Sequence, residues 1–300
     1  MRIGAVYGLV VLATVFWGAN FVLAGPVLAD LSPLWAAAER FILGAGTMFL
    51  LARWRGEALA ELGRRHMGAY ALLGVVGIGA FNLLFFYALK STSAANAALI
   101  MATNPLVTTL IAAMVLGESP SARQLGALPI ALVGVVVVIS GGSLEHLKAL
   151  NVARGDLLML GANLAWALYN VLSKRYMPRG GSAVANTTLV MSAGAIVLLV
   201  AAITEGGGIP SMPGTSALTA LVVMALAGTV LAYLFWNTGI AYLGAGRTAL
   251  FLNLVPVFAM LTGILGGTLP THVQLIGGAI VISGVSLAMI PGKRSLRTTA

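Results

Sequence analysis

Aromatic and asparagine side chains occur together inside the apolar segments of this sequence, at spacings that put them on one side of a helix. Residues three or four positions apart share a helix face. Rings bind apolar bodies and amides bind polar groups, so this pattern is typical of a site for a small molecule with a ring or apolar tail and a polar end. The alternative is that the rings only pack and the amides only join helices. We predict a substrate-binding lining of Trp17, Asn20, Phe21, Asn82, Phe86, Trp166, Tyr169, Asn170, Tyr233, Trp236 and Asn237.

Nothing in the sequence predicts catalysis. The three histidines, His66, His146 and His272, are scattered, and no HExxH, GxxxxGK[ST] or GxSxG motif occurs. The chain has no cysteine, which excludes disulfides and thiolate metal sites. We therefore expect no enzymatic activity, no cofactor and no bound metal.

The composition indicates which elements must position the lining. Of the 300 residues, 59% are hydrophobic and 8% are charged, and the mean hydropathy is +0.99. Soluble domains carry about a quarter charged residues, and roughly 20 apolar residues cross a bilayer as a helix. We expect an all-α, polytopic membrane protein, because a membrane segment must satisfy its own backbone hydrogen bonds. The ten predicted transmembrane helices cover residues 4–26, 33–52, 68–89, 94–116, 123–141, 155–177, 183–204, 216–238, 246–266 and 272–291.

The net charge of +9 comes from cations that flank these spans, so it indicates membrane topology and not nucleic-acid binding. An N-terminus on the cytoplasmic side puts thirteen cations inside: Arg2, Arg53, Arg55, Arg64, Arg65, Arg123, Lys174, Arg175, Arg179, Arg247, Lys293, Arg294 and Arg297. Only Lys90, Lys148 and Arg154 then lie outside. Both termini are therefore predicted to be cytoplasmic.

The chain repeats itself with a period of about 150 residues. Pro105 aligns with Pro256, Gln124 with Gln274, and "FWGANFVL" at residues 16–23 with "AWALYNVL" at residues 165–172. Each half, residues 1–142 and 153–292, then holds five helices. Because five is odd, the second half enters the membrane from the opposite face, and two inverted repeats enclosing a midplane site are a transporter architecture.

The alignment also predicts how the lining is divided. Asn20 aligns with Tyr169, and Asn82 aligns with Tyr233. The same exchange relates Phe21 to Asn170 and Phe86 to Asn237. An amide in one half therefore corresponds to an aromatic residue in the other, and we expect one amide-rich and one aromatic wall at each level of the site.

Two prolines and one charged pair have further candidate roles. Pro105 and Pro256 fall near mid-helix, where a proline frees a carbonyl, and we predict hinges there, with simple kinks as the alternative. Glu39 and Arg40 lie inside the second span, where charge is costly. They are candidates for coupling or gating, with a structural pair as the alternative.

Several motifs together resemble the EamA-type, ten-helix branch of the drug/metabolite transporter superfamily. They are "FWGANF", "ERF" in the second span, and "AANAALIMATNPLVTTLIAAMVLGES" followed by "QLGALPIALVGV". The resemblance covers essentially the whole chain and is closest to bacterial inner-membrane exporters of amino acids, aromatic ones included. Glu118 in "GES" departs from the repeat, because "GGTLP" in the second half has no acidic counterpart.

The resemblance implies a secondary active or facilitative transporter that exports small metabolites by alternating access across the bacterial inner membrane. Large or aromatic amino acids are the expected substrates. One alternative is a multidrug exporter of hydrophobic organic cations, which aromatic walls also bind. Another is a membrane scaffold that transports nothing.

The expected partners are a small-molecule substrate and membrane lipid, with no nucleic acid. Proton coupling and facilitated diffusion stay open, as do a monomer and a weak dimer. The glycine pairs Gly4/Gly8 and Gly263/Gly267 are predicted to permit close helix approach, with a dimer contact as the alternative.

Overall fold

Both halves of the chain fold into long helices. The structure is a computed structural model that describes residues 1–92, 94–141, 143, 145, 154–205, 208–267 and 269–289, and it has no strand among them. The first half contains α1 (Ile3–Asp30), α2 (Pro33–Trp54), α3 (Leu59–Gly74), the π-helix η1 (Val75–Ala80), α4 (Phe81–Leu89), α5 (Ala94–Ala102), α6 (Asn104–Leu116) and α7 (Ala122–Ser140). The second contains α9 (Arg154–Tyr176), α10 (Ala183–Thr204), α11 (Thr215–Val223), the π-helix η2 (Met224–Leu231), α12 (Ala232–Leu243), α13 (Ala245–Ala249), η3 (Leu250–Asn253), α14 (Leu254–Gly263), η4 (Ile264–Gly266) and α15 (His272–Met289).

Nine helical segments of the described residues are long and apolar enough to cross a membrane, and they correspond to nine of the ten predicted spans. The tenth prediction, residues 155–177, is α9. Its 23 residues reach about 35 Å, but it carries more polar residues than the others. Tyr169 and Asn170 of the predicted lining are among them, and both are buried.

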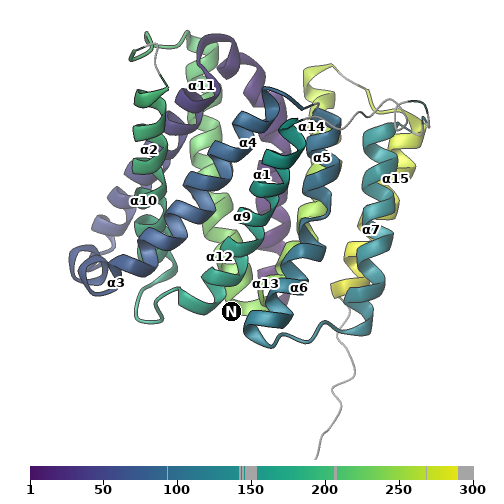
Figure 1. Cartoon of the computed structure of the whole chain (residues 1–300), viewed down its shortest axis with the longest axis horizontal. Coiled ribbons are helices and arrows are strands. Elements are labelled where there is room, and N and C mark those ends of the chain that lie inside the picture. The colour runs from purple at the N-terminus through teal and green to yellow at the C-terminus, as the bar shows by residue number, and fades with distance from the viewer. Residues whose placement is uncertain are drawn as a thin grey trace, which may run out of the picture.

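The helices of the two halves pack in pairs that recur when the halves are exchanged (Figure 1). α1 packs on α12 and α14 of the second half, and α9 packs on α4 and α6 of the first. α2 lies against α10, α7 against α15, and α6 against α13. Inverted repeats related by a pseudo-two-fold axis produce this pattern.

Aligned residues begin the last helix of each repeat. At the start of α7, the Ser121 N–H donates to Gln124 Oε1 at 2.8 Å and the Gln124 N–H donates to Ser121 Oγ at 3.3 Å. At α15, Thr271 and Gln274 exchange the same two bonds at 2.9 and 3.2 Å. Each capping box satisfies two backbone donors that a helix start leaves free. The aligned glutamines are therefore repeated helix starts.

Glycines bring α7 and α15 close together. A Cβ atom at Gly134 would lie 2.6 Å from a backbone nitrogen of α15, and one at Gly284 would lie 2.8 Å from a backbone nitrogen of α7. By contrast, a Cβ atom at Gly4 or Gly8 would meet nothing within 4 Å. The predicted close approach at Gly4 and Gly8 is therefore wrong within the chain, and the same holds at Gly267, while a dimer contact there stays a prediction.

Two predicted helix boundaries are also wrong. The first span is predicted at residues 4–26, but α1 runs to Asp30 with Pro26 inside it. A proline disturbs only the turn before it, and the Leu31 N–H still bonds to the Val27 carbonyl at 2.9 Å. The eighth span is predicted to end at residue 238, but its helical segment runs to Leu243. The predicted start of the third span at residue 68 falls beside a break, because the helix from Leu59 is kinked at His66, where φ is −127° and ψ is 26°.

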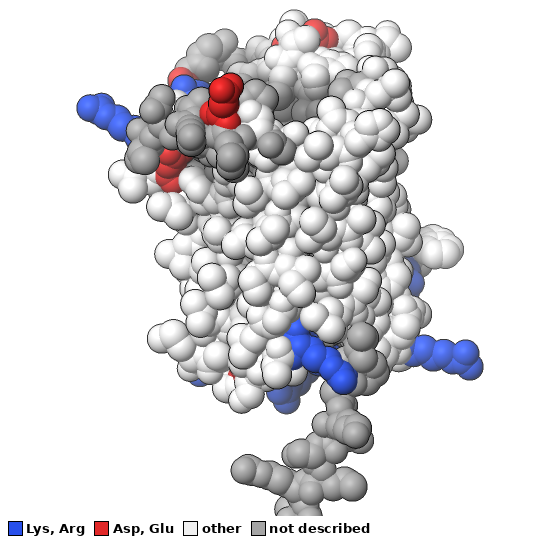
Figure 2. All heavy atoms as spheres, turned by 90° about the vertical axis from the view of Figure 1, so that its right-hand side faces the viewer, with Lys and Arg blue, Asp and Glu red and all other residues white. Residues whose placement is uncertain are grey.

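Cations gather at the end of the bundle where α1 begins, which we call the N-terminal end, while acidic side chains lie mainly at the opposite end (Figure 2). Ten of the cations counted for one side lie in described residues near the N-terminal end: Arg2, Arg53, Arg55, Arg64, Arg65, Arg123, Lys174, Arg175, Arg179 and Arg247. Lys148, Lys293, Arg294 and Arg297 lie outside the described residues. Which end faces the cytoplasm stays a prediction from this distribution.

Candidate functional site

Seven aromatic residues from both repeats meet in the middle of the bundle. We call them the ring cluster: Trp17, Phe41, Phe81, Trp166, Tyr169, Tyr233 and Trp236. Trp17 lies midway along α1 and Trp166 midway along α9, with ring centroids 5.5 Å apart. Trp17 also lies 4.9 Å from Trp236, and Trp166 lies 5.8 Å from Tyr233. These spacings fall in the range of favourable aromatic pairs.

Two members of the ring cluster were missed by the sequence prediction. Phe41 on α2 is fully buried with its centroid 5.7 Å from that of Tyr233, and Phe81 at the start of α4 lies 5.1 Å from Trp166. The available signal was spacing, since Phe81 is one turn before Phe85 on the same helix face. Phe41 follows Arg40 directly, and no spacing distinguishes it from a core residue.

The predicted amides of the second repeat bond to predicted aromatics of the same repeat. Tyr169 OH donates to Asn237 Oδ1 at 2.7 Å, and Trp236 Nε1 donates to Asn170 Oδ1 at 2.8 Å. Both bonds join α9 to α12. The amides therefore lie beside rings as expected, but the expectation that amide and ring walls come from opposite halves is wrong for these pairs.

A glycine in each π-helix faces the ring cluster across the two repeats. A Cβ atom at Gly77 in η1 would lie 2.0 Å from the Tyr169 ring, and one at Gly228 in η2 would lie 2.4 Å from the Asn20 amide. Trp17 Nε1 donates to the Gly228 carbonyl at 3.0 Å. Because Asn20 aligns with Tyr169, the two contacts are equivalent. π-Helices are rare and often mark functional sites.

Two hydrogen-bond donors in this region have no partner among the described residues. They are Trp166 Nε1 and Asn170 Nδ2, and both atoms are buried. Buried polar groups in native structures are nearly always paired, and each exception calls for an explanation such as a ligand or a water. The counterpart of Trp166, Trp17, has its indole N–H satisfied.

Arg40 meets the predicted amide of α4 next to the ring cluster. Arg40 Nη2 donates to Asn82 Oδ1 at 3.3 Å, and Asn82 Nδ2 donates to the Ile78 carbonyl of η1 at 2.7 Å. Arg40 Nε is buried without a partner, and none of the ion pairs in the described residues includes Arg40 or its neighbour Glu39. An intramembrane cation costs about 2.5–3.5 kcal/mol on insertion scales, so a residue of this kind marks a functional site by default.

A cavity of about 40 Å³ opens beside Arg40. We call it the Arg40 cavity; its lining is otherwise apolar and includes Ala24 and Val27 of α1, Phe86 of α4, and Leu221 and Met224 of the second repeat. Phe86 lines this cavity, and its ring also lies 5.5 Å from that of Phe85, which contacts Phe81 of the ring cluster.

Phe21 is the one predicted lining residue that the structure places away from the others. It is 62% exposed, and none of the ring contacts in the described residues includes it. Successive helical residues turn by about 100°. Phe21 consequently points away from the side of α1 that Asn20 and Val27 share.

Both predicted hinge prolines follow a break in a helix. Pro105 lies in the first turn of α6, after Thr103 separates it from α5, and Pro256 lies in the first turn of α14, after the 3₁₀ segment η3. Asparagines on α6 and α9 join at the first break, where Asn104 Nδ2 donates to Asn163 Oδ1 at 2.6 Å and Asn163 Nδ2 donates to the Ile100 carbonyl at 2.8 Å. Whether the breaks move stays a prediction.

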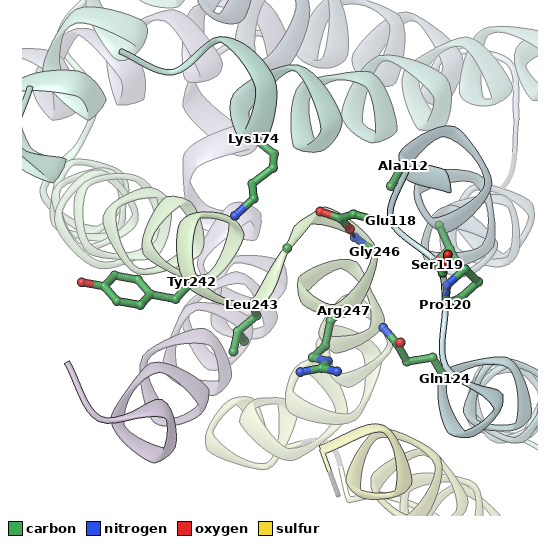
Figure 3. A pocket seen from close by; sticks show the side chains of 12 residues that line it. Ala112, Glu118, Ser119, Pro120, Gln124, Lys174, Tyr242, Leu243, Gly246 and Arg247 are labelled. Atoms are coloured by element: carbon green, nitrogen blue, oxygen red, sulfur yellow. Dashed lines mark hydrogen bonds between the residues drawn. The ribbon is translucent and has the colours of Figure 1, made fainter. Parts of the chain in front are cut away.

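A second, larger cavity of about 290 Å³ lies at the N-terminal end between α6 and α13. We call it the Glu118 cavity. Glu118 accepts backbone N–H groups of Ala245 and Gly246 at 3.4 Å each, so the end of α6 contacts the start of α13. Lys174, Arg247 and Gln124 surround the same space (Figure 3). Neither cavity is lined by Trp17.

Comparison with known proteins gives a consistent family. The EamA-like transporter family matches the chain twice, at residues 4–140 and 153–290. The "Uncharacterized transporter YyaM" of Bacillus subtilis strain 168 is 38% identical over 277 residues, covering 92% of this chain and 90% of that protein. A "Probable amino-acid metabolite efflux pump" of Salmonella typhimurium strain LT2 is 28% identical over 301 residues, covering 97% of this chain and 96% of its own.

A further relative and a solved structure are also similar to the chain. A "Probable terminal-alkyne amino-acid exporter" of Streptantibioticus cattleyicolor is 27% identical over 226 residues, covering 74% of this chain and 73% of that protein. A solved structure titled "Crystal structure of protein" superposes with a TM-score of 0.79 at 21% identity, covering 95% of this chain and 97% of that chain. This likeness shows that the two chains share a fold.

Proposed function

The chain belongs to the EamA-like transporter family, and on that premise we propose that it exports amino acids with large or aromatic side chains across the bacterial inner membrane. The observation that carries the proposal is the ring cluster. It draws on both repeats at mid-helix depth and holds two unpaired buried donors, Trp166 Nε1 and Asn170 Nδ2. An apolar side chain fits among rings, and a carboxylate or carbonyl oxygen satisfies free donors.

The mechanism we propose is alternating access. The rings contact one another and Trp17 lines neither of the two cavities described above, which supports entry of the substrate when the repeats move apart. The π-helices and the breaks before Pro105 and Pro256 are the places where the backbone departs from regular α-helix, and they lie on the helices that would bend. The predicted hinge role of the two prolines belongs to this proposal.

Export of organic cations receives less support. A cation-binding site in a membrane normally needs a buried carboxylate. The charge closest to the ring cluster among the described residues is instead Arg40, whose neighbour in the chain, Phe41, belongs to the cluster. Glu39 is half-buried and makes no ring or ion-pair contact in the described residues.

Reconstituted vesicles test the proposal. Purified protein in liposomes should carry labelled L-phenylalanine, and Trp17→Ala or Trp166→Ala should reduce the initial rate about 10-fold or more, because each removes rings that contact the substrate. Trp54, 84% exposed at the end of α2, provides the matched control, and Trp54→Ala should transport normally. Wild-type rates in both variants would show that the substrate binds elsewhere. An imposed pH gradient in the same vesicles decides between proton coupling and facilitated diffusion.

A topology assay tests the predicted location. The surplus of cations at the N-terminal end supports cytoplasmic termini. A reporter fused to residue 300 should be active only in its cytoplasmic form. If the fused reporter is active only in its extracytoplasmic form, the N-terminal end of the bundle faces away from the cytoplasm and the predicted orientation is wrong.

A further inference from the structure

We propose that Arg40 and Asn82 form the subsite that binds the carboxylate of the transported molecule, so that a substrate of this chain must carry a carboxylate and an amine without one is not transported. The inference rests on the proposed function and adds to it a recognition group. The juxtaposition that supports it is a guanidinium, an amide and a small cavity, all next to the ring cluster.

The first step is the missing counter-charge. An arginine stays protonated under all ordinary conditions, and Arg40 is half-buried with its Nε fully buried, where a cation without an anion is unfavourable. The ion pairs of the described residues are Arg55–Glu57, Arg65–Glu61 and Lys90–Glu205. Arg40 is in none of them. An anion from outside the chain is the natural partner of this group.

The second step is the geometry of the free donors. Asn82 Oδ1 takes one Nη2 hydrogen bond at 3.3 Å, and the Phe41 ring lies 5.0 Å from the guanidinium carbon. Nε remains unpaired. A carboxylate binds a guanidinium best through two parallel N–H···O bonds, and Nε with one Nη nitrogen provides such an edge. Asn82 holds the guanidinium in place, since its own amide is fixed to the Ile78 carbonyl at 2.7 Å.

The third step is the size of the Arg40 cavity. About 40 Å³ exceeds the roughly 10–15 Å³ that one water needs, yet it is too small for a whole amino acid. The cavity therefore suits a carboxylate-sized group whose apolar body lies elsewhere. The ring cluster is the adjacent place for that body, because the Arg40 guanidinium carbon lies 5.0 Å from the Phe41 ring and Phe41 belongs to the cluster.

The charge of the lining restricts the ligand class further. Arg40 is the single charged residue of the Arg40 cavity, and the rest of its lining is apolar. One guanidinium balances one negative charge, whereas a phosphate dianion calls for more donors and more positive charge. A monocarboxylate is the anion that matches.

The decisive experiment compares three ligands of one shape. Full-length protein in detergent is incubated with L-phenylalanine, with 3-phenylpropionate, which lacks the ammonium group, or with phenethylamine, which lacks the carboxylate. A ligand that binds the folded state raises the apparent unfolding temperature. We expect a rise with the first two and none with phenethylamine. A rise with phenethylamine equal to that with L-phenylalanine would overturn the inference.

Variants assign the effect to the subsite. Arg40→Gln should weaken L-phenylalanine binding about 10-fold to 100-fold, the loss expected for hydrogen bonds to a charged group. Asn82→Asp puts a carboxylate beside the guanidinium, so it should block binding equally, although it also loses the hydrogen bond that Asn82 Nδ2 donates to the Ile78 carbonyl. Arg64→Gln removes an exposed cation from α3 and should bind normally. Wild-type affinity in Arg40→Gln would disprove the subsite and leave the export proposal standing.

Two further outcomes separate the proposals. If no ligand binds the wild-type protein and the vesicles carry no amino acid, both are wrong. An anionic lipid headgroup offers similar chemistry to Arg40, so the same measurement is made with added phosphatidylglycerol. Stabilisation by this lipid that needs Arg40, with none by the carboxylates, would assign Arg40 to lipid and overturn the substrate subsite.

Discussion

The two repeats hold their buried amides in different ways. In the second, Asn170 and Asn237 accept hydrogen bonds from Trp236 and Tyr169, which joins α9 to α12. In the first, Asn82 accepts from Arg40, a charged group. The second repeat therefore joins its amides to its own rings and leaves Trp166 Nε1 and Asn170 Nδ2 unpaired there among the described residues, whereas the first repeat presents a guanidinium that needs a further partner. The two repeats therefore share a backbone arrangement but use their buried asparagines differently: those of the second repeat accept from rings, and Asn82 accepts from Arg40.

The two repeats also differ in the charged residues that they carry inside the membrane spans and at their ends. α2 carries Glu39 and Arg40, but α10, its counterpart in the second repeat, has no charged residue between Ala183 and Thr204. Glu118 likewise ends the fourth span of the first repeat without an acidic counterpart in the second. Because these charges occur in one repeat only, a state open at the N-terminal end and a state open at the opposite end would differ in energy. Under the proposed alternating access, we expect the charges of the first repeat to favour one of the two open states.

The largest expected effect comes from filling the glycine contact of the first repeat. Gly77→Ala puts a methyl group 2.0 Å from ring carbons of Tyr169, which is fully buried and cannot move aside. We expect a loss of about 3 kcal/mol or more, the upper range for overpacking, or failure to fold. Gly228→Ala meets the Asn20 amide at 2.4 Å, but Asn20 is only half-buried and can rotate, so we expect about 1 kcal/mol.

The apparent unfolding temperature in detergent measures both glycine variants. Gly126→Ala is the matched control, because a Cβ atom there meets nothing within 4 Å. It should be as stable as the wild type or slightly more so. Equal losses at Gly77 and Gly228 would mean that the two contacts are mechanically equivalent, contrary to the comparison above.

A smaller difference is expected between the amides themselves. Asn237→Ala deprives the buried Tyr169 hydroxyl of its acceptor, which should cost about 1–3 kcal/mol. Asn20→Ala removes an amide that has no hydrogen bond in the described residues, so its cost should stay below about 1 kcal/mol. The same thermal measurement compares them. If Asn20→Ala loses more stability than Asn237→Ala, the amide that contributes more to folding lies in the first repeat, contrary to the expectation.

The general fold was predictable from sequence because its causes are local. Apolar runs of membrane length, cationic flanks and the repeat at Gln124 and Gln274 each depend on neighbouring residues. Helix ends were less predictable, because they depend on tertiary contacts. α1 continues past Pro26 where its last turns pack on α11, and η1 and η2 have no simple sequence pattern beyond the glycines Gly77 and Gly228.

The site was predictable in part for a related reason. Helix spacing brought Trp17, Trp166, Tyr233 and Trp236 into one cluster, since their faces follow from counting residues. It failed for Phe21, because spacing does not say how far a buried face extends around a helix. Other contacts, such as Arg40 with Asn82 and Glu118 with α13, join segments far apart in the sequence, and spacing within a helix carries no information on them.

The two ends of the bundle differ in the kind of contact that joins their helices. At the N-terminal end, Glu118 accepts backbone N–H groups at the start of α13, a contact typically worth about 0.5–2 kcal/mol. Glu118→Ala should open this end more often. The natural chain has no cysteine, so a single Ala112→Cys, buried in the Glu118 cavity, reports the opening. We expect maleimide labelling about 3-fold to 30-fold faster, with Glu118→Gln intermediate. Unchanged labelling would show that Glu118 does not hold this end closed.

The smallest effect is expected at the opposite end, where Lys90 Nζ lies 2.5 Å from Glu205 Oε1 and joins α4 to α10. The hydrogen bond with Glu205 raises the pKa of Lys90 above its ordinary value of 10.5. A raised lysine pKa adds stability that is complete below the unfolded pKa and disappears as the pH rises through the folded one.

Lys90→Gln should therefore lower the unfolding temperature by less than about 3 °C at pH 8, the range for an exposed pair, and by nothing at pH 12. Arg65→Gln breaks the Arg65–Glu61 pair, which lies within one helix at the N-terminal end, and should cost less because it joins no two helices. If Lys90→Gln lowers the unfolding temperature more than Glu118→Ala does, the helices are held more firmly at the opposite end than at the N-terminal end, and the comparison is reversed.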